Sequence, residues 1–322
     1  MSWFVFALVC LLGWGFADLF YSMGTDEKDR FSHLKLAVWV GLVMGLCSLG
    51  LLIFARPMSL SALLEGAVRY SPASLCYILS MVIGYAGIRY LEMSVISPVQ
   101  NASGALSTLV MIVFWLMTGR AAEIREAFGM LDITGTGLIV CGVIALAAVE
   151  KKLAAGERRL TSQKEDRKYR LGALALIFPL LYCLFDTVGT AADGILLDGE
   201  TGLQLDEIEV LILYGLTFLL AGAGCWLYML IRTGRPYNPF QRSEGKKAIA
   251  ACCEEFGQVF YVYAMSLNPL ASAPMVASYC AVSVLLCRLF RKERLSTGQY
   301  ACIAAVIAGI VLLGISEGLG EA

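Results

Sequence analysis

The sequence has very little histidine and little charge. It contains one histidine, His33, and Asp, Glu, Lys and Arg together make up 16% of its 322 residues. A single histidine argues strongly against a histidine-based metal site and against a Ser–His catalytic group, because both need an imidazole beside other reacting groups. Soluble globular domains carry about a quarter charged residues, so the shortage of charge places the chain among membrane proteins.

Several chemical motifs are missing as well. The chain has no CxxC pair, no HExxH, no cluster of aspartates and no GxxxxGK[ST] loop for ATP phosphates. Most of the eleven cysteines lie inside apolar runs, where free cysteine behaves as a small apolar residue. The net charge of −1 gives no general attraction to nucleic acid. The sequence therefore predicts no metal, no cofactor, no nucleic-acid partner and a protein that is not an enzyme.

Long apolar stretches are abundant. Apolar residues make up 58% of the chain and the mean hydropathy is +0.72, and a helix needs about 20 such residues to cross a bilayer. The first stretch carries Asp18 and has no basic segment before it, so we interpret it as a retained helix rather than a signal peptide. We expect an all-α integral membrane protein with ten transmembrane helices. The ten windows are at about residues 3–22, 34–54, 72–90, 95–118, 131–149, 171–191, 208–231, 247–266, 272–290 and 298–316.

The chain divides into two halves that resemble each other. Residues 151–169 are a basic polar linker between a five-helix unit at 1–150 and another at 170–322. Residues 92–115 and 264–290 both contain Met-Ser, then a proline, then small residues, then a long apolar run. Since each half has an odd number of helices, the halves would have opposite orientations. We therefore expect a 5+5 inverted repeat around a central cavity, an arrangement typical of transporters.

The placement of positive charge predicts the orientation. Most of the Lys and Arg residues lie in the connections after the first, fifth, seventh and ninth windows. Positive residues collect in cytoplasmic loops. These connections are therefore expected in the cytoplasm, with both termini outside a plasma or inner cell membrane.

Two stretches resemble a known family. Residues 264–314 contain a proline-bearing entry, a long helix, a turn at Glu293, Arg294 and Leu295, and a final helix rich in small residues, while LLGWGFADLF at 11–20 contains a Trp-Gly start. Together they resemble the drug/metabolite transporter superfamily, EamA type. The resemblance implies a ten-helix inverted-repeat carrier, working as an exporter, whose cavity is lined by helices one, three and four and by their repeat mates six, eight and nine.

The chain departs from this family in two respects. The turn after the fourth window reads TGRAAE and lacks the Glu-Arg pair. Many relatives keep both termini inside, which is opposite to the orientation that the charge distribution predicts. We give more weight to the charge distribution, because small members of the superfamily adopt either orientation according to their Lys and Arg placement.

Two aspartates occupy matching places in the two halves. Asp18 and Asp186 lie about fifteen residues into the first and sixth windows, and each follows aromatic residues that include Trp14 and Tyr182 respectively. An ionisable residue at membrane depth costs a few kcal/mol and normally faces a cavity or a partner. We expect this pair to bind a cation or to carry a proton. The alternative is that each lies near a helix end and faces interfacial water.

Two adjacent glutamates interrupt the eighth window. Because helical neighbours are rotated by about 100°, Glu254 and Glu255 cannot both face one small site. Glu254 shares a face with Gln258 and Tyr261, and we expect these three residues to line the cavity. Glu255 either pairs with a basic group or holds a proton, since burial favours the neutral carboxylic acid. The alternative is that the interface exposes both glutamates.

The third and fourth windows meet at a polar junction. Arg89 lies three residues before Glu92, either as a local ion pair or with Arg89 placed to pair with an embedded or substrate carboxylate. The next window opens with Gln100, Asn101 and Ser103, which offer neutral donors and acceptors for a substrate.

Prolines mark the entries of the fourth and ninth windows. Pro98 either breaks its helix and frees backbone carbonyls for a site, as in many transporters, or occupies the first turn of an ordinary helix. Pro274 holds the corresponding place in the second half, and Tyr279 follows it as a further lining residue.

These features favour a secondary carrier of a small organic metabolite or drug. Acidic side chains beside aromatic rings favour an organic cation, although amino acids and nucleobases are not excluded. The expected partners are this small molecule, the lipid bilayer and protons that drive alternating access, and the protein is expected to be a monomer. The alternatives are a membrane-embedded lipid-modifying enzyme and a receptor or scaffold that transports nothing.

Overall fold

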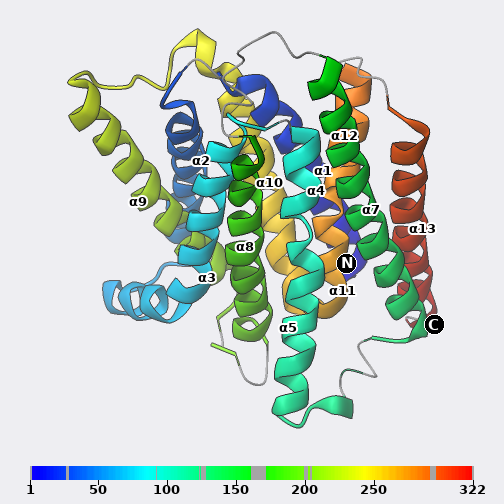
Figure 1. Cartoon of the computed structure of the whole chain (residues 1–322). Helices are drawn as coiled ribbons and strands as arrows, with labels where there is room; N and C mark the ends of the chain where they lie inside the picture. The colour runs from blue at the N-terminus through cyan, green and yellow to red at the C-terminus, as the bar shows by residue number, and fades with distance from the viewer. Residues whose placement is uncertain are drawn as a thin grey trace.

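The computed structural model describes residues 2–26, 29–91, 93–122, 124, 128–160, 172–198, 202–203, 205–290 and 295–320. Within that part every regular element is a helix, and the helices run side by side as one bundle (Figure 1). Their bounds are α1 Trp3–Gly24, α2 Ser32–Phe54, α3 Leu60–Gly87, α4 Met93–Gln100, α5 Ser103–Met117, α7 Met130–Leu160, η2 Gly172–Leu176, α8 Ile177–Leu196, α9 Glu207–Thr233, η3 Arg242–Glu244, α10 Gly245–Leu267, α11 Pro269–Ala277, α12 Tyr279–Phe290 and α13 Thr297–Gly320.

Seven segments are long and apolar enough to cross a membrane, which supports a multi-pass membrane protein. They are α1, α2, Met130–Val149 of α7, Leu174–Leu196 around α8, α9, Pro269–Phe290 across α11 and α12, and α13. Ten spans were expected, and α3, α5 and α10 are absent from this group of seven. Two of these have a visible reason: α5 is short, and α10 carries two lysines and two glutamates.

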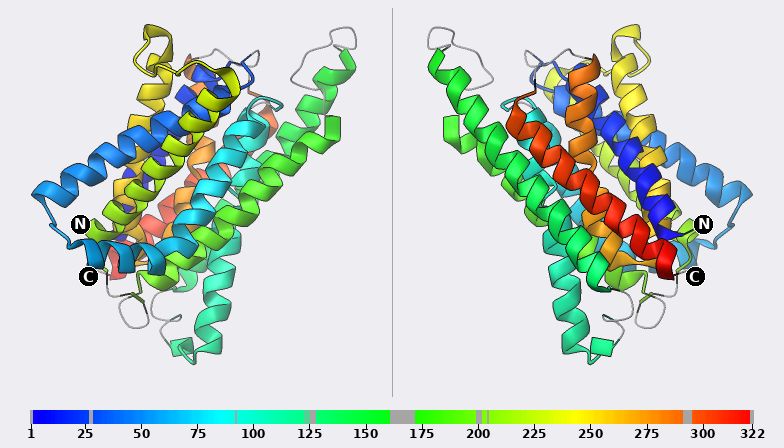
Figure 2. Two further views of the ribbon diagram at one scale, coloured as in Figure 1. Left: turned by 90° about the vertical axis from the view of Figure 1, so that its left-hand side faces the viewer. Right: turned by 90° about the vertical axis from the view of Figure 1, so that its right-hand side faces the viewer.

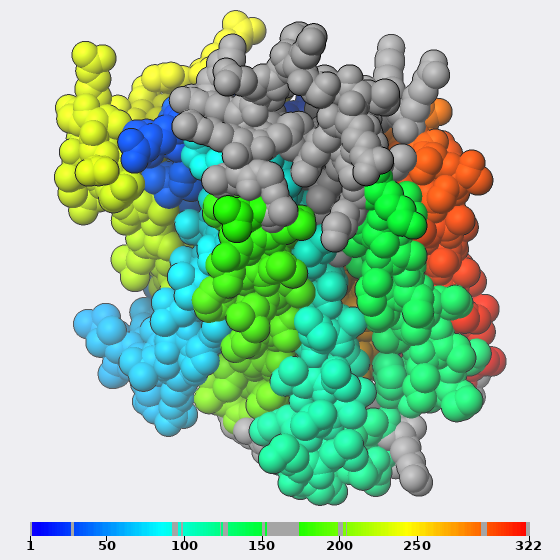
Figure 3. Space-filling view, in the orientation of Figure 1, coloured from blue at the N-terminus to red at the C-terminus, as the bar shows by residue number. Residues whose placement is uncertain are grey.

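The outer surface of the bundle is apolar, and α8 illustrates the pattern. Leu180, Leu184 and Val188 follow one another at four-residue spacing and are exposed. Asp186 and Thr190 lie on the opposite, inward side of the same helix. Figure 3 shows α8 beside α3 and α5 on this outer face. Apolar side chains that point outward and polar side chains that point inward fit a helix surrounded by lipid.

Two helices extend beyond the expected windows. Helix α3 begins at Leu60 rather than near residue 72, because Pro72 lies inside the helix and does not end it. The added turns present Leu60, Leu64 and Val68 as an exposed stripe, and Figure 1 shows this part bent away from the bundle. Helix α7 continues to Leu160, so the first part of the expected linker 151–169 is helical, and residues 161–169 lie outside the described residues.

Two of the expected spans are broken in the middle. The window 95–118 is divided into α4 and α5 by Asn101 and Ala102, and the window 272–290 is divided into α11 and α12 by Ser278. Pro98 and Pro274 each lie inside the helix that precedes the break. The prolines therefore do not themselves end the helices, because α4 continues past Pro98 to Gln100 and α11 continues past Pro274 to Ala277.

Small residues allow the helices of the two halves to approach closely. The most extensive contacts join α2 to α9, α1 to α10, α7 to α13 and α3 to α8. A Cβ atom on Gly41 of α2 would lie 3.0 Å from Cα of Gly222 in α9, and one on Gly13 of α1 would lie 3.1 Å from Cα of Gly257 in α10. Backbones at such separations leave no room for a side chain, as is common between membrane helices.

We predict that Gly41→Ala destabilises the protein by about 1–3 kcal/mol, the usual cost of overpacking a closed interface. The added methyl would meet the backbone carbonyl of Phe218, which cannot rotate away as a side chain can. Thermal unfolding in detergent measures the effect. Gly50→Ala, in the same helix but with open space around it, is the matched control and should be neutral or slightly stabilising. Equal melting temperatures for the two variants would contradict the close approach.

Candidate functional site

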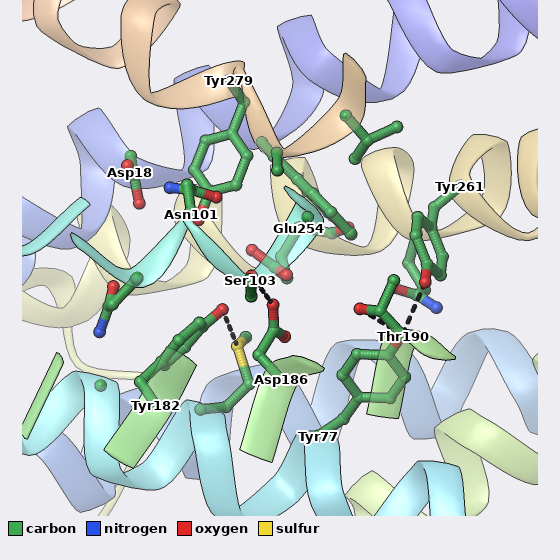
Figure 4. Close-up of a pocket in the computed structure, with 18 of the residues that line it drawn as sticks. Asp18, Tyr77, Asn101, Ser103, Tyr182, Asp186, Thr190, Glu254, Tyr261 and Tyr279 are labelled. Atoms are coloured by element: carbon green, nitrogen blue, oxygen red, sulfur yellow. Dashed lines mark hydrogen bonds between the residues drawn. The ribbon is translucent and has the colours of Figure 1, made fainter. Parts of the chain in front are cut away.

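A cavity lies inside the bundle where the two broken helices meet. Side chains from α1, α3, α8, α9 and α10 line it together with the residues around both breaks (Figure 4). Its volume is about 60 Å³, about twice the volume that one water molecule occupies in the liquid. The site is therefore small in this conformation, and it draws on both halves of the chain.

Asp18 of α1 is held by the segment that precedes the first break. Its Oδ2 accepts a hydrogen bond of 2.6 Å from the Ser97 hydroxyl. Asn101, at the break itself, donates from Nδ2 to the Ser97 carbonyl at 2.7 Å and to its hydroxyl at 3.2 Å. Asp18 is 7% exposed. The carboxylate therefore points into the protein rather than to interfacial water.

Asp186 of α8 is held by the segment that follows the same break. Its Oδ2 accepts a hydrogen bond of 2.6 Å from the hydroxyl of Ser103, the first residue of α5 (Figure 4). The two aspartates are thus anchored to opposite sides of one break, Asp18 through Ser97 and Asp186 through Ser103. A break in α4–α5 therefore organises two carboxylates that come from different halves of the chain.

Glu254 of α10 is the third acidic group in the cavity. The Tyr21 hydroxyl donates to its Oε2 at 3.3 Å, and the Tyr85 hydroxyl donates to Tyr21 at 3.0 Å. The Trp14 indole donates to the Glu254 backbone carbonyl at 3.2 Å. This contact fixes how far α10 is shifted along α1, and it places Glu254 beside the Trp14 ring.

Aromatic rings form much of the cavity wall. Trp14 stacks on Tyr261 with centroids 5.2 Å apart, and Tyr279 meets Trp14 edge-on at 5.7 Å. Tyr182 lies across the cavity with its hydroxyl 4.0 Å from the sulfur of Met81 (Figure 4). Ring faces beside carboxylates attract organic cations through both charge and the ring quadrupole.

Two buried amides in the cavity lack partners. The Nε2 atoms of Gln100 and Gln258 have no hydrogen-bond partner among the described residues. The two side chains are 6% and 2% exposed, so neither is satisfied by bulk water. A buried donor without a partner costs about 1–3 kcal/mol. These amides are therefore free to donate to an acceptor on a bound molecule or to water in the cavity.

Not every residue expected at the site lines the cavity. Glu255 is buried on another side of α10, and its hydrogen-bond partner is the Cys47 thiol of α2. Arg89 lies just past the end of α3, with its guanidinium carbon 5.6 Å from the centre of the Tyr90 ring. Neither Glu255 nor Arg89 is among the residues that line the cavity, because the rotation between helical neighbours turns Glu255 away from it and Arg89 lies past the end of α3. Glu92, the other member of the expected ion pair, lies outside the described residues.

The remaining expected side chains meet at the cavity. They are Trp14, Asp18, Gln100, Asn101, Ser103, Tyr182, Asp186, Glu254, Gln258, Tyr261 and Tyr279. Pro274 is not among the lining residues, which fits its place inside α11, and the side chain of Pro98 lies outside the described part of the chain. Among the described residues, no group of three or more His, Cys, Asp or Glu is placed to hold a metal ion.

Several cavity residues were not predicted from the sequence. Tyr21 lies seven residues after Trp14, and Thr190 lies four residues after Asp186. A spacing of four or seven residues places two side chains on the same face of a helix. The helical period could therefore have predicted Tyr21 from Trp14 and Thr190 from Asp186. Tyr77 and Tyr214 also line the cavity, but they lie in apolar helices whose pattern does not single out one face.

Comparisons with known proteins give the fold and no more. No family model matches the chain, and no curated protein does. A solved structure described as "Crystal structure of protein" is similar to it, with a TM-score of 0.60, 13% sequence identity and coverage of 99% of both chains. At that identity the likeness shows a shared fold across the whole length and carries no function.

The Ser103–Asp186 contact is predicted to couple α5 to α8. In a double-mutant cycle with Ser103→Ala and Asp186→Asn, we expect a coupling energy of about 1–3 kcal/mol, because the hydroxyl donates to a carboxylate in a poorly hydrated site. Unfolding in mixed micelles, followed by circular dichroism, gives the four free energies. Ser71→Ala replaces Ser103→Ala in the control cycle, since the exposed Ser71 hydroxyl bonds only its own helix. Additive effects in the first cycle would show that the contact does not form.

Proposed function

We propose that this protein is a secondary carrier that moves a small organic cation across a membrane by alternating access. The observation that carries the proposal is the cavity, in which Asp18, Asp186 and Glu254 converge beside stacked aromatic rings. Carboxylates inside a membrane helix bundle are costly and normally serve a substrate, an ion or a proton. Contributions from both halves of the chain fit a site that lies between two moving units.

The helix contacts support a 5+5 inverted repeat. Each of the ten expected membrane spans can be paired with the span five places later in the chain, so that α1 pairs with α8 and α3 pairs with α10. Under this pairing the contact of α1 with α10 becomes the contact of α8 with α3. The contacts of α2 with α9 and of α7 with α13 then map onto themselves, and the contact of α5 with α11 becomes the contact of α4 with α12. The broken spans α4–α5 and α11–α12 also occupy corresponding places. This pattern is expected of ten membrane passes related by a two-fold axis, and it agrees with the EamA-type resemblance of residues 264–314.

The position of the chain ends supports an even number of passes. Figure 2 shows both ends of the described chain at the same end of the bundle. Helices α1, α7, α9 and α12 finish at the opposite end, at the top of Figure 1. The basic connections expected in the cytoplasm follow these four helices. We propose that this opposite end faces the cytoplasm of a cell membrane.

An ion pair supports closure at the end that carries the termini. Arg120, just after α5, pairs with Asp198, just after α8, through contacts of 2.6 and 3.1 Å. Both side chains are 11% exposed, and the guanidinium also lies 4.8 Å from the centre of the Trp115 ring. A two-pronged arginine–carboxylate contact is among the stronger polar contacts in proteins. Release of this pair would let α5 and α8 separate and open the cavity outward.

We predict that organic cations stabilise the protein and that Glu254→Gln weakens this effect. Tetraphenylphosphonium and hydrophobic primary amines are the probes, with amino acids and nucleobases tested alongside. A ligand present at about a hundred times its Kd stabilises a folded protein by about 2.7 kcal/mol, and thermal unfolding of the purified protein detects this. Glu255→Gln is the matched control, because Glu255 is the neighbouring residue but lies outside the cavity.

The pattern across the panel decides between sites. A cation shift that is lost in Glu254→Gln and kept in Glu255→Gln supports the proposed substrate class. Stabilisation by neutral or anionic compounds that both variants retain would keep a carrier but overturn the cation preference, and would point to the amides of Gln100 and Gln258. Uptake into proteoliposomes of the compound that binds then tests transport, and binding without any uptake would contradict a carrier.

The orientation has its own test. A peptide tag at the C-terminus should bind an antibody on intact cells, because the end of the bundle with the termini is proposed to face outward. The same tag inserted within residues 161–169 should bind only after the cells are permeabilised, since that connection follows α7. The reverse pattern would place both termini inside, as the family resemblance implies.

A further inference from the structure

Another buried acid, Asp193, lies outside the cavity. Asp193 follows Asp186 by seven residues in α8, close to the end of that helix at Leu196. Its exposed fraction is 0%, and it is not among the residues that line the cavity. The carrier proposed above gives it no task, yet an acidic side chain this deep in a bundle of apolar helices needs a reason to be there.

The carboxylate of Asp193 is only half satisfied. Oδ1 accepts a hydrogen bond of 2.7 Å from the Tyr70 hydroxyl of α3. Among the described residues no donor forms a close hydrogen bond to Oδ2, although the hydroxyls of Tyr77 and Tyr261 face the carboxylate. Buried polar atoms are normally paired, and each exception calls for an explanation. Oδ2 is therefore a buried acceptor that a proton can satisfy without further space.

The titratable groups that face Asp193 carry no positive charge. They are Tyr70 and Tyr77 from α3, Tyr214 from α9, Tyr261 from α10 and Asp186 from its own helix α8. Neither an arginine nor a lysine is among them, so no ion pair within the described residues neutralises the aspartate. A buried carboxyl group with no cation beside it is favoured in its neutral form, and that form carries a proton.

A chain of hydroxyl groups joins Asp193 to the cavity. The Tyr77 and Tyr261 hydroxyls lie 2.6 Å apart, and Tyr77 also donates to the Thr190 hydroxyl at 3.2 Å. All three residues line the cavity, and Figure 4 shows their hydroxyl ends turned toward one another. Asp193 lies less than one turn beyond Thr190 along α8, and both tyrosines face its carboxylate. The hydroxyls of Tyr77, Thr190 and Tyr261 thus form a connected layer between the cavity and Asp193.

We propose that Asp193 is a proton-binding site, linked to the cavity by the hydroxyls of Tyr261 and Tyr77. A hydronium ion in the cavity gives a proton to the Tyr261 oxygen and is left as water, while Tyr261 passes its own proton to Tyr77 and Tyr77 passes its own to Oδ2. Each hydroxyl gains one proton and loses one, so the net change is the transfer of one proton from the hydronium ion to Asp193. The role of this proton in transport rests on the proposed carrier function, whereas the proton site itself does not.

A metal cation fits this site less well than a proton does. Hard cations such as Ca²⁺ and Mg²⁺ take six or more oxygen ligands and usually need several carboxylates or carbonyls. Here one carboxylate is surrounded by tyrosine hydroxyls, which donate protons more readily than they coordinate ions. Hydroxyls 2.6 Å apart are well suited to proton transfer.

Infrared difference spectroscopy tests the proton site without any substrate. The full chain in lipid nanodiscs is stepped from acidic to alkaline buffer, in light and in heavy water, and the carbonyl stretch of protonated carboxylic acids is followed. We expect the wild type to lose a band of this kind, and Asp193→Asn to lack one component of it. Tyr70→Phe should move that component to higher frequency, because the carbonyl oxygen loses its donor, and this variant keeps the carboxylate if Asp193→Asn does not fold.

Two control variants separate Asp193 from other acids. Asp186→Asn removes a cavity carboxylate and should keep the Asp193 component. Asp132→Asn removes a buried carboxylate that is already bonded by the Gly129 amide and the Ser316 hydroxyl, and should leave the component unchanged. A full band in Asp193→Asn, or no shift in Tyr70→Phe, would overturn the proposal. A component that responds to sodium rather than to pH would show a cation site instead. If no compound binds the cavity but the component behaves as expected, the carrier proposal fails and the proton site stands.

Discussion

The break between α4 and α5 is the constraint on which the arrangement of the cavity depends. Lipid offers no hydrogen bonds, so an interrupted helix at membrane depth must be enclosed by protein and its polar groups must find partners there. Asn101 meets this need by bonding back to Ser97, and Ser97 and Ser103 in turn hold Asp18 and Asp186. An uninterrupted helix would present these two serines along one continuous spiral. The interruption instead allows them to reach carboxylates that belong to different helices.

Close packing of the two halves explains why the cavity is narrow and why it involves both of them. Glycines at the contacts of α1 with α10 and of α2 with α9 bring backbones so near that the halves cannot slide freely past each other. At Gly257 this closeness also makes room for Trp14, whose indole bonds the carbonyl of Glu254. The same glycine therefore sets the helix spacing and the position of the aromatic wall. Bundles held in this way change shape by discrete movements of packed units, and the proposed alternating access would need movements of this kind.

The sequence predicted the coarse fold because a membrane helix has a simple length and composition signal. It did less well at helix boundaries: the third span was expected from about residue 72, yet α3 begins at Leu60 and runs through Pro72. At the site, the cost of charge in a membrane singled out Asp18, Asp186 and Glu254, all of which the structure places at the cavity. Periodicity separated Glu254 from Glu255 in the right sense, although Glu255 was still kept as a candidate. Tyr214 and Asp193 could not be found in this way, because contacts between distant helices, rather than the pattern along one helix, decide what they face.

Placing Asp186 and Asp193 on one helix has an electrostatic consequence for the proposed carrier. Asp186 and Asp193 lie seven residues apart in α8, and like charges in a poorly hydrated bundle disfavour each other's ionised form. A cation that binds at Asp186 lowers the repulsion there and so favours the ionised form of Asp193, which releases its proton. A proton that returns to Asp193 leaves Asp186 as the only charge of the pair and restores its attraction for the next cation. Exchange of substrate for a proton would then need no moving segment between Asp186 and Asp193. The hydroxyls of Tyr77, Thr190 and Tyr261, which lie between the cavity and Asp193, would be enough.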